Sequence, residues 1–266
     1  MKKVMFAAAM AAAFAATAEI ESANTVGYTS KDVTAGKYYL IGTQFDKAGT
    51  TTAGRIDMND LIKLSSELAP GLYSDDFATA PQISVLTAAG GYTPYYYISD
   101  GTDDTDADLG YSAWCDADGY ELTEEMKLEL GKGFWFYSPT SSGTLTTVGQ
   151  VSEAASTTLS FTAGKYSIFC NPYPVAVSLQ TLTTSATPGA YGDDFATAPQ
   201  ISVLTAVGGY TPYYYISDGT DDTDADLGYN AWCDADGYEL SGAQIDAGAA
   251  FWIYSPTTAG SITFSL

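Results

Sequence analysis

Histidine is missing from all 266 residues of this chain. Without imidazole, Ser-His-Asp and Cys-His catalysis are excluded, as is every zinc site that needs histidine. Basic residues are scarce too: 10 lysines and arginines stand against 32 acidic residues, a formal net charge of −22. Nucleic acids and anionic lipids are bound through exposed lysine and arginine, so we expect neither as a partner.

Long apolar segments are also missing, except at the N-terminus. There Met1-Lys2-Lys3 precedes an uncharged, alanine-rich run and the small residues Ala16-Thr17-Ala18. This order predicts a cleavable secretory signal over residues 1–18 rather than a buried alanine-rich helix. No later stretch reaches the roughly 18 apolar residues of a transmembrane helix, so we expect no membrane insertion. The mature chain is expected to be secreted, to the cell surface, the extracellular space or the periplasm.

An internal repeat organises the rest of the chain. The segment from Asp75 to Leu122 returns from Asp193 to Leu240, and only two of its 48 positions differ. The similarity extends outward with gaps, because Gly36-Lys37-Tyr38 corresponds to Gly164-Lys165-Tyr166. We therefore divide the chain into a signal (1–18), a lead segment (19–29), repeat 1 (30–150) and repeat 2 (151–266).

Each repeat reads as mainly β. In repeat 1 we expect strands over 37–45, 82–87, 92–99, 133–140 and 144–150, with hairpins joining the second to the third and the fourth to the fifth. Pro94 places its strand at an edge or a bulge. Apolar spacing predicts one short helix over 59–68, reduced to about one turn at 178–182 in repeat 2. The fold class is thus all-β, with two tandem β-sandwich or small-barrel modules.

An acidic loop lies in the repeated segment. The seven carboxylates of repeat 1 are Asp100, Asp103, Asp104, Asp106, Asp108, Asp116 and Asp118, and their equivalents are Asp218, Asp221, Asp222, Asp224, Asp226, Asp234 and Asp236. Carboxylates this close together repel one another, and a calcium ion, which takes 6–8 oxygen ligands, would relieve that repulsion. The EF-hand pattern fails, because Leu109 stands where glycine is required. Two readings stay open: a calcium loop of another kind, and an acidic surface that faces water.

Aromatic residues accompany this loop. Tyr95-Tyr96-Tyr97, Trp114 and their equivalents Tyr213-Tyr214-Tyr215 and Trp232 are candidates for contact with a glycan or a protein. Strand alternation turns at least one tyrosine of each run outward or to a rim. The alternative is that these rings cover a thin core.

The three cysteines are too few for a disulfide framework. Cys115 and Cys233 occupy equivalent positions, whereas Cys170 replaces Gly42 and has no counterpart. A Cys115–Cys233 bridge, within the chain or between chains, requires the repeats to pack about a pseudo-twofold axis. The other reading makes both cysteines small buried hydrophobic residues.

A family resemblance is carried by Gly164-Lys165-Tyr166-Ser167-Ile168-Phe169-Cys170-Asn171-Pro172-Tyr173-Pro174 and by Gly131-Lys132-Gly133-Phe134-Trp135-Phe136. The pattern resembles the GWNLIGNPYP … PGxGFW β-modules of secreted bacterial surface proteins, particularly duplicated proteins of unassigned function from the Planctomycetes–Verrucomicrobia group. Ser22–Tyr28 in the lead segment is similar too. Repeat 1 departs from the family pattern, because it has Gly42-Thr43-Gln44-Phe45 where Asn-Pro-Tyr-Pro is expected. Repeat 2 departs from it with Ala249-Ala250 in place of Lys132-Gly133. The resemblance implies secretion and β architecture, and it supplies no catalytic residues.

A non-enzymatic function follows from these patterns. Glycoside hydrolysis needs two carboxyls about 5–9 Å apart with one pKa raised by burial, which a loop of many aspartates does not provide. We expect a secreted surface or extracellular-matrix protein that acts in adhesion or self-assembly, with itself or another surface protein as partner. The alternative is a carbohydrate-binding protein whose acidic loops are ordered by calcium.

Overall fold

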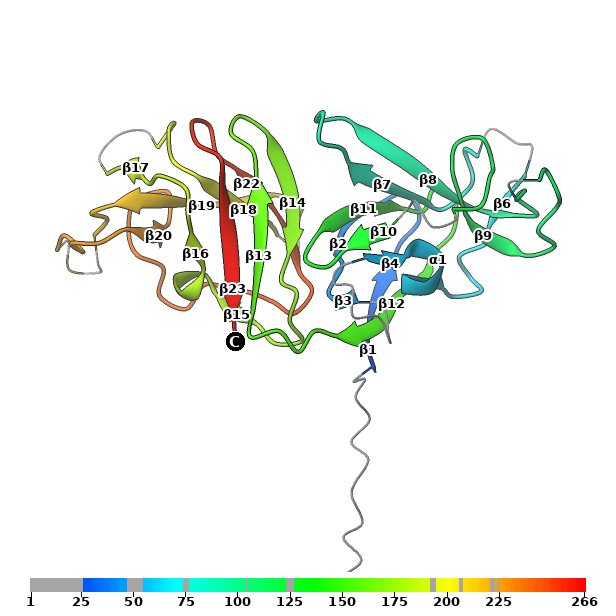
Figure 1. Cartoon of the computed structure of the whole chain (residues 1–266), viewed down its shortest axis with the longest axis horizontal. Helices are drawn as coiled ribbons and strands as arrows, with labels where there is room; N and C mark the ends of the chain where they lie inside the picture. Colours follow the sequence, from blue (N-terminus) through cyan, green and yellow to red (C-terminus); the bar gives the residue numbers. More distant parts are fainter. Residues whose placement is uncertain are drawn as a thin grey trace, which may run out of the picture.

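The computed structural model describes residues 26–46, 55–73, 77–103, 105–122, 127–191, 195–205, 208–220, 223 and 225–266. The predicted signal (1–18), most of the lead segment, Asp104, Asp221, Asp222 and Asp224 lie outside this description. The two repeats lie side by side along the long axis of the molecule (Figure 1). No helix of the described part combines the length and hydrophobicity needed to cross a membrane.

Repeat 1 contains two main sheets. The large sheet has the order β2-β11-β7-β8-β6, with β9 on β8, and the small sheet has the order β1-β12-β3, with β5 on β12. Strands β4 and β10 form a separate pair. The bounds are β1 Val26–Val33, β2 Tyr38–Gly42, β3 Phe45–Asp46, β4 Arg55–Asp57, α1 Met58–Leu61, β5 Ile62–Leu64, β6 Gly71–Leu72, β7 Gln82–Leu86, β8 Tyr92–Ser99, β9 Ser112–Cys115, β10 Lys127–Glu129, β11 Gly133–Tyr137 and β12 Gly143–Val151.

Repeat 2 has the same plan. Its large sheet runs β14-β22-β18-β19-β17 with β20 on β19, its small sheet runs β13-β23-β16, and β15 pairs with β21. The bounds are β13 Ser156–Phe161, β14 Tyr166–Cys170, β15 Val177–Ser178, η1 Leu179–Thr181 (a 3-10 helix), β16 Thr183–Thr184, β17 Gly189–Ala190, β18 Gln200–Leu204, β19 Tyr210–Ser217, β20 Ala231–Cys233, β21 Gln244–Ile245, β22 Ala250–Tyr254 and β23 Gly260–Ser265.

Each core lies between the large and the small sheet of its repeat. In repeat 1 Phe134 and Phe136 of β11 pack with Leu145 of β12 and with Trp114 of β9. The core of repeat 2 contains the equivalent Phe251 and Trp232. The all-β fold class is therefore confirmed, and the strand order of each sheet is open rather than closed into a barrel.

Three local expectations are corrected. The predicted helix over 59–68 is limited to α1, because Ile62–Leu64 instead forms β5 and pairs with Leu145–Thr147 of β12. The predicted hairpin between 133–140 and 144–150 is wrong, because β11 belongs to the large sheet and β12 to the small one. Residues 26–29, assigned to the lead segment, lie in β1 and pair with β12.

Candidate functional site

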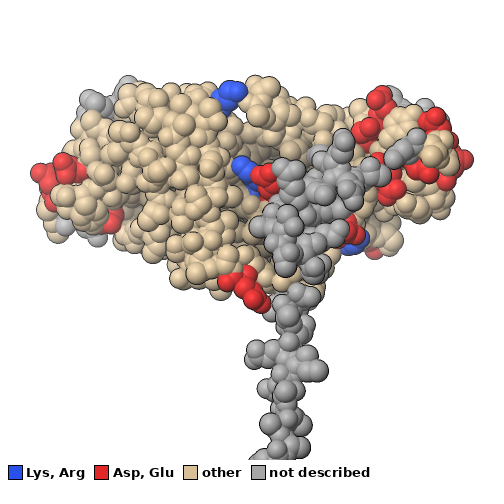
Figure 2. All heavy atoms as spheres, viewed as in Figure 1, with Lys and Arg blue, Asp and Glu red and all other residues tan. Residues whose placement is uncertain are grey.

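The acidic loops lie at the two far ends of the molecule. We call residues 100–122 and 218–240 the tips. Most of the acidic side chains visible in Figure 2 gather there. Each tip is held by backbone bonds: in repeat 1 the Thr102 N–H donates to the Gly119 carbonyl (3.0 Å), and the Glu121 N–H donates to the Thr102 carbonyl (2.8 Å). The same two bonds recur at Thr220 in repeat 2.

Several tip carboxylates stabilise the loop itself. Asp103 accepts hydrogen bonds from the Thr105 N–H (2.8 Å), the Thr105 hydroxyl (2.6 Å) and the Ala107 N–H (3.1 Å). The Thr105 hydroxyl, followed by the backbone donors, lowers the pKa of Asp103. Asp116 accepts from the N–H groups of Asp118 and Tyr120, and Asp234 does the same in repeat 2. These are the side-chain turns that aspartate forms in loops.

Tyrosines close over other carboxylates. The Tyr120 hydroxyl donates to Asp106 at 2.6 Å, and this bond raises the pKa of Tyr120. Tyr111 donates to Glu121 at 2.9 Å, and this bond likewise raises the pKa of Tyr111. Among the described residues no three carboxylate or cysteine side chains are grouped so as to hold a metal ion. Asp100 and Asp218 lie where each tip begins and adopt a positive φ, which aspartate tolerates better than most residues.

Of the two readings of Cys115 and Cys233, the structure fits the buried one and contradicts a bridge within the chain. All three cysteines are free and buried. Cys115 packs with Ala80, Ile98 and Ala113 beneath one tip, and Cys233 occupies the same place beneath the other. The two thiols therefore belong to separate cores and do not form a bridge within the chain. Burial, with smaller contributions from nearby carboxylates, raises the pKa of each to about 12.

The aromatic candidates divide in two groups. Trp114 is 0% and Trp232 2% exposed, so these tryptophans are core residues, and their prediction as contact residues is wrong. The Tyr95–Tyr97 and Tyr213–Tyr215 runs are half-buried and pack against the cores on both faces of their strands. The reading of these rings as cover for a core thus fits the structure.

A different set of aromatic residues lies on the outer faces of the large sheets. We call this set the aromatic stripe. It passes from Tyr137 through Tyr38 and Trp135 to Trp252, Tyr166 and Tyr254, so that it crosses from one repeat to the other. The order Phe134-Trp135-Phe136-Tyr137 contains the signal for it, since alternate residues of a strand face opposite sides.

The repeats meet where β2 and β11 approach β14 and β22. Two isolated bridges join them, Ile41 to Ala249 and Lys132 to Phe169. These pairs exchange equivalent positions, because Ile41 corresponds to Phe169 and Lys132 to Ala249. The interface is thus an internal pseudo-twofold, in which equivalent surfaces of the two repeats pack together. Its apolar centre consists of Ile168, Cys170 and Ala250, with Leu40, Leu86, Trp135 and Trp252 packed around it.

Residues that differ between the repeats fit this interface. A Cβ on Gly42 would lie 2.3 Å from the Gly248 carbonyl oxygen and 2.4 Å from Cys170 Cβ, and a Cβ on Gly133 would lie 2.4 Å from Ile168. Cys170 in turn donates its N–H to the Gly131 carbonyl at 2.8 Å. A glycine of repeat 1 therefore faces a larger residue of repeat 2.

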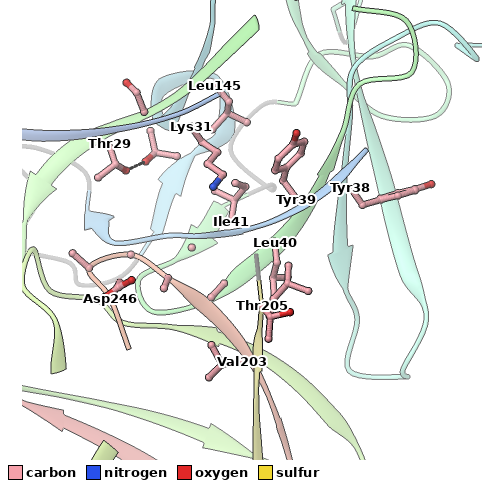
Figure 3. Close-up of a pocket in the computed structure, with 18 of the residues that line it drawn as sticks. Thr29, Lys31, Tyr38, Tyr39, Leu40, Ile41, Leu145, Val203, Thr205 and Asp246 are labelled. Atoms are coloured by element: carbon pink, nitrogen blue, oxygen red, sulfur yellow. Dashed lines mark hydrogen bonds between the residues drawn. The ribbon is translucent and has the colours of Figure 1, made fainter. Parts of the chain in front are cut away.

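Two clefts flank the interface. The larger, about 870 Å³, has Lys31 and Tyr38 on one side and Thr205 and Asp246 on the other (Figure 3), and Lys37 also lines it. The smaller, about 340 Å³, is lined by the equivalent surface with Glu129, Lys132 and Lys165. Four of the five basic side chains that the structure describes thus line these clefts.

Two lysines of the smaller cleft make contacts across the interface. Lys132, whose equivalent in repeat 2 is Ala249, reaches over the Phe169 ring, 4.5 Å from its centroid. Burial lowers the pKa of Lys132, against a smaller opposite effect of Glu129. Lys165 donates to the Ala88 carbonyl at 2.6 Å and so ties the repeats together across the smaller cleft.

The structure thus separates the predicted residues into loop-building aspartates, core tryptophans and buried thiols. It adds the aromatic stripe and the inter-repeat interface, which sequence reasoning missed. Comparison with models of protein families, with curated proteins and with solved structures finds no match for this chain.

Proposed function

We propose that this is a non-enzymatic surface or extracellular-matrix protein that uses its two tips to bridge partners in adhesion or self-assembly. The observation that carries the proposal is the placement of the repeated segment. The near-identical segment includes both tips, which form the two opposite ends of the molecule (Figure 1), so one contact chemistry is presented twice. Two linked sites give an avidity that exceeds the affinity of either site without any new contact.

The small hydrophobic cores beneath the tips support the same proposal. The described part of each tip lies over its own small core, and the two cores contain equivalent residues. The exposed tyrosines Tyr111 and Tyr229, 54% and 53% exposed, stand at equivalent places and suit contact with a protein. Glycan binding at calcium-ordered tips, the alternative, has weaker support there, because Trp114 and Trp232 are buried and Asp103, Asp116 and Asp234 already accept backbone hydrogen bonds.

The test compares single and double tip variants. Sedimentation velocity would follow self-association of residues 19–266, and beads coated with the chain would be tested for adhesion to cells that express it, both with calcium and with a chelator. We expect Tyr111→Ala or Tyr229→Ala alone to weaken multivalent attachment by roughly tenfold or more, and the double variant to abolish it. The proposal fails if the wild-type chain neither associates nor adheres, or if the double variant behaves as wild type.

A further inference from the structure

The aromatic stripe is exposed and continuous. The side chains of Tyr38 and Tyr166 are 62% and 58% exposed, although each carries a large aromatic ring. Trp135 and Trp252 lie half-buried between them, with ring centroids 6.4 Å apart. Soluble proteins seldom leave such contiguous aromatic surface uncovered unless it serves as a binding site.

Contacts among the rings fix their positions before any ligand arrives. Tyr38 stacks on Tyr137 at 4.4 Å, and Tyr166 stacks on Tyr254 at 4.5 Å. Edge-to-face contacts then join Tyr38 to Trp135 and Tyr166 to Trp252. A platform ordered in advance loses little side-chain entropy on binding.

Neutral polar groups run beside the rings. In the strand register Trp135 lies opposite Ser84 and Tyr137 opposite Gln82. Gln82 donates to Ser84 at 2.9 Å, and Gln200 donates to Ser202 at 2.8 Å beside Trp252. The Trp252 indole N–H also donates to the Tyr210 hydroxyl at 3.3 Å. All of these groups are uncharged donors and acceptors.

The combination indicates the chemistry of the ligand. A pyranose ring has an apolar face that can cover an aromatic ring and hydroxyls at its edge that can reach amide and hydroxyl groups. The chain as a whole carries a net charge of −22, which disfavours an acidic polymer, and the lysines nearest the stripe, Lys37 and Lys165, lie in the clefts beside Tyr38 and Tyr166 rather than along the rings of β11 and β22. A stripe that crosses both repeats also suits an extended ligand better than a single sugar.

We propose that the aromatic stripe binds an uncharged polysaccharide chain along the outer faces of β2, β11, β14 and β22. Rings of both repeats stack on successive sugar units, and the serine and glutamine side chains beside them bind the hydroxyls. The site is separate from the tips and does not rest on the bridging proposal.

Tryptophan fluorescence offers a direct test. The chain has four tryptophans, and two of them, Trp114 and Trp232, are buried in the cores. A ligand on the stripe therefore changes the emission of Trp135 and Trp252. The probes are cellohexaose, xylohexaose, mannohexaose and maltohexaose, added to residues 19–266, with calorimetric titration of any probe that changes the emission.

The decisive variant is the double substitution Tyr38→Ala and Tyr166→Ala. Both side chains are largely exposed, so the fold should persist, and we expect at least one probe to bind about tenfold more weakly than to wild type. The matched control is Tyr28→Ala, an exposed tyrosine of β1 in the small sheet and outside the stripe, which should leave the affinity unchanged.

Three results would overturn the proposal. None of the four probes changes the fluorescence of the wild-type chain, or the binding survives in the Tyr38→Ala and Tyr166→Ala variant. The third result is that this variant loses self-association while no oligosaccharide binds, which would make the stripe a protein interface. Loss of bridging in the tip variants, with glycan binding intact, would leave the stripe proposal standing.

Discussion

The tips and the inter-repeat interface show opposite relations between the two repeats. Within the repeated segment only two of 48 positions differ, and only one of these, Ser112 against Asn230, lies in the tips. At the interface the repeats diverge, with Gly42 opposite Cys170 and Gly133 close to Ala250 and Ile168. A pseudo-twofold contact places equivalent residues near one another, so a tight fit there requires one small and one larger partner. Divergence thus permits the repeats to pack, while identity keeps the two ends alike.

Core substitutions at equivalent positions should have the largest effect. Phe134→Ala and Phe251→Ala each empty a fully buried site, and we expect each to lower the free energy of unfolding by about 3–5 kcal/mol. Urea denaturation followed by tryptophan fluorescence measures both, since Trp114 and Trp232 report on the two cores. A loss below about 1 kcal/mol in one repeat only would show that the two cores are not equivalent.

Interface glycines come next. Gly42→Ala places a methyl group 2.3 Å from the Gly248 carbonyl oxygen, and a backbone atom cannot move aside cheaply. We expect a loss of about 1–3 kcal/mol and, because the repeats uncouple, a broader or two-step unfolding transition. The matched control is Gly91→Ala, where the nearest atom lies 3.9 Å away. If both variants unfold at the same urea concentration, the result contradicts a close contact between Gly42 and the Gly248 carbonyl across the interface.

Buried thiols provide a third comparison, this time between folded and unfolded chain. Burial raises the pKa of Cys115 and Cys233 from the ordinary 9.0 to about 12. A raised thiol pKa contributes stability that is complete below pH 9 and is lost as the pH rises towards 12. At pH 8 iodoacetamide should label the native chain roughly a hundredfold more slowly than the chain in urea. Three thiols should react in urea without reductant, and fewer would reveal a disulfide.

Some of this architecture could be predicted from the sequence. Strands β7 and β8 and the turn between them follow from alternation and from Gly90-Gly91, because turn chemistry is local. The placement of β11 and β12 in different sheets could not be predicted, because two strands that follow each other in the sequence can either pair in one sheet or lie in two sheets. Segment 62–64 has helical spacing, yet pairing with β12 overrides it.

Side-chain direction was the other limit. The alternation of Phe134-Trp135-Phe136-Tyr137 shows that aromatic residues occupy both faces of the strand, but it does not say which face is covered. Trp114, chosen as a contact residue, proved to be at the centre of the core, whereas Trp135 is half-exposed. The choice depends on the second sheet, which packs from a distant part of the chain.

The smallest expected effect concerns Asp103, and it decides what the tip carboxylates do. Asp103→Ala removes an acceptor for three hydrogen bonds, so the amides of Thr105 and Ala107 should exchange with solvent faster, while the melting temperature hardly changes because these bonds lie at the surface of the loop. Since the fold lowers the pKa of Asp103, the order that it gives is present above pH 3.8 and is lost as the pH falls below that value.

Two controls sharpen this prediction. Asp103→Asn keeps one acceptor oxygen and should retain most of the protection, and Asp118→Ala removes a negative charge at the same tip without removing these bonds. If Asp103→Ala and Asp118→Ala have the same effect on exchange, charge density rather than hydrogen bonding governs the loop. In that case a cation that relieves repulsion becomes the better explanation of the acidic tips, and their calcium dependence in the bridging experiment should be pronounced.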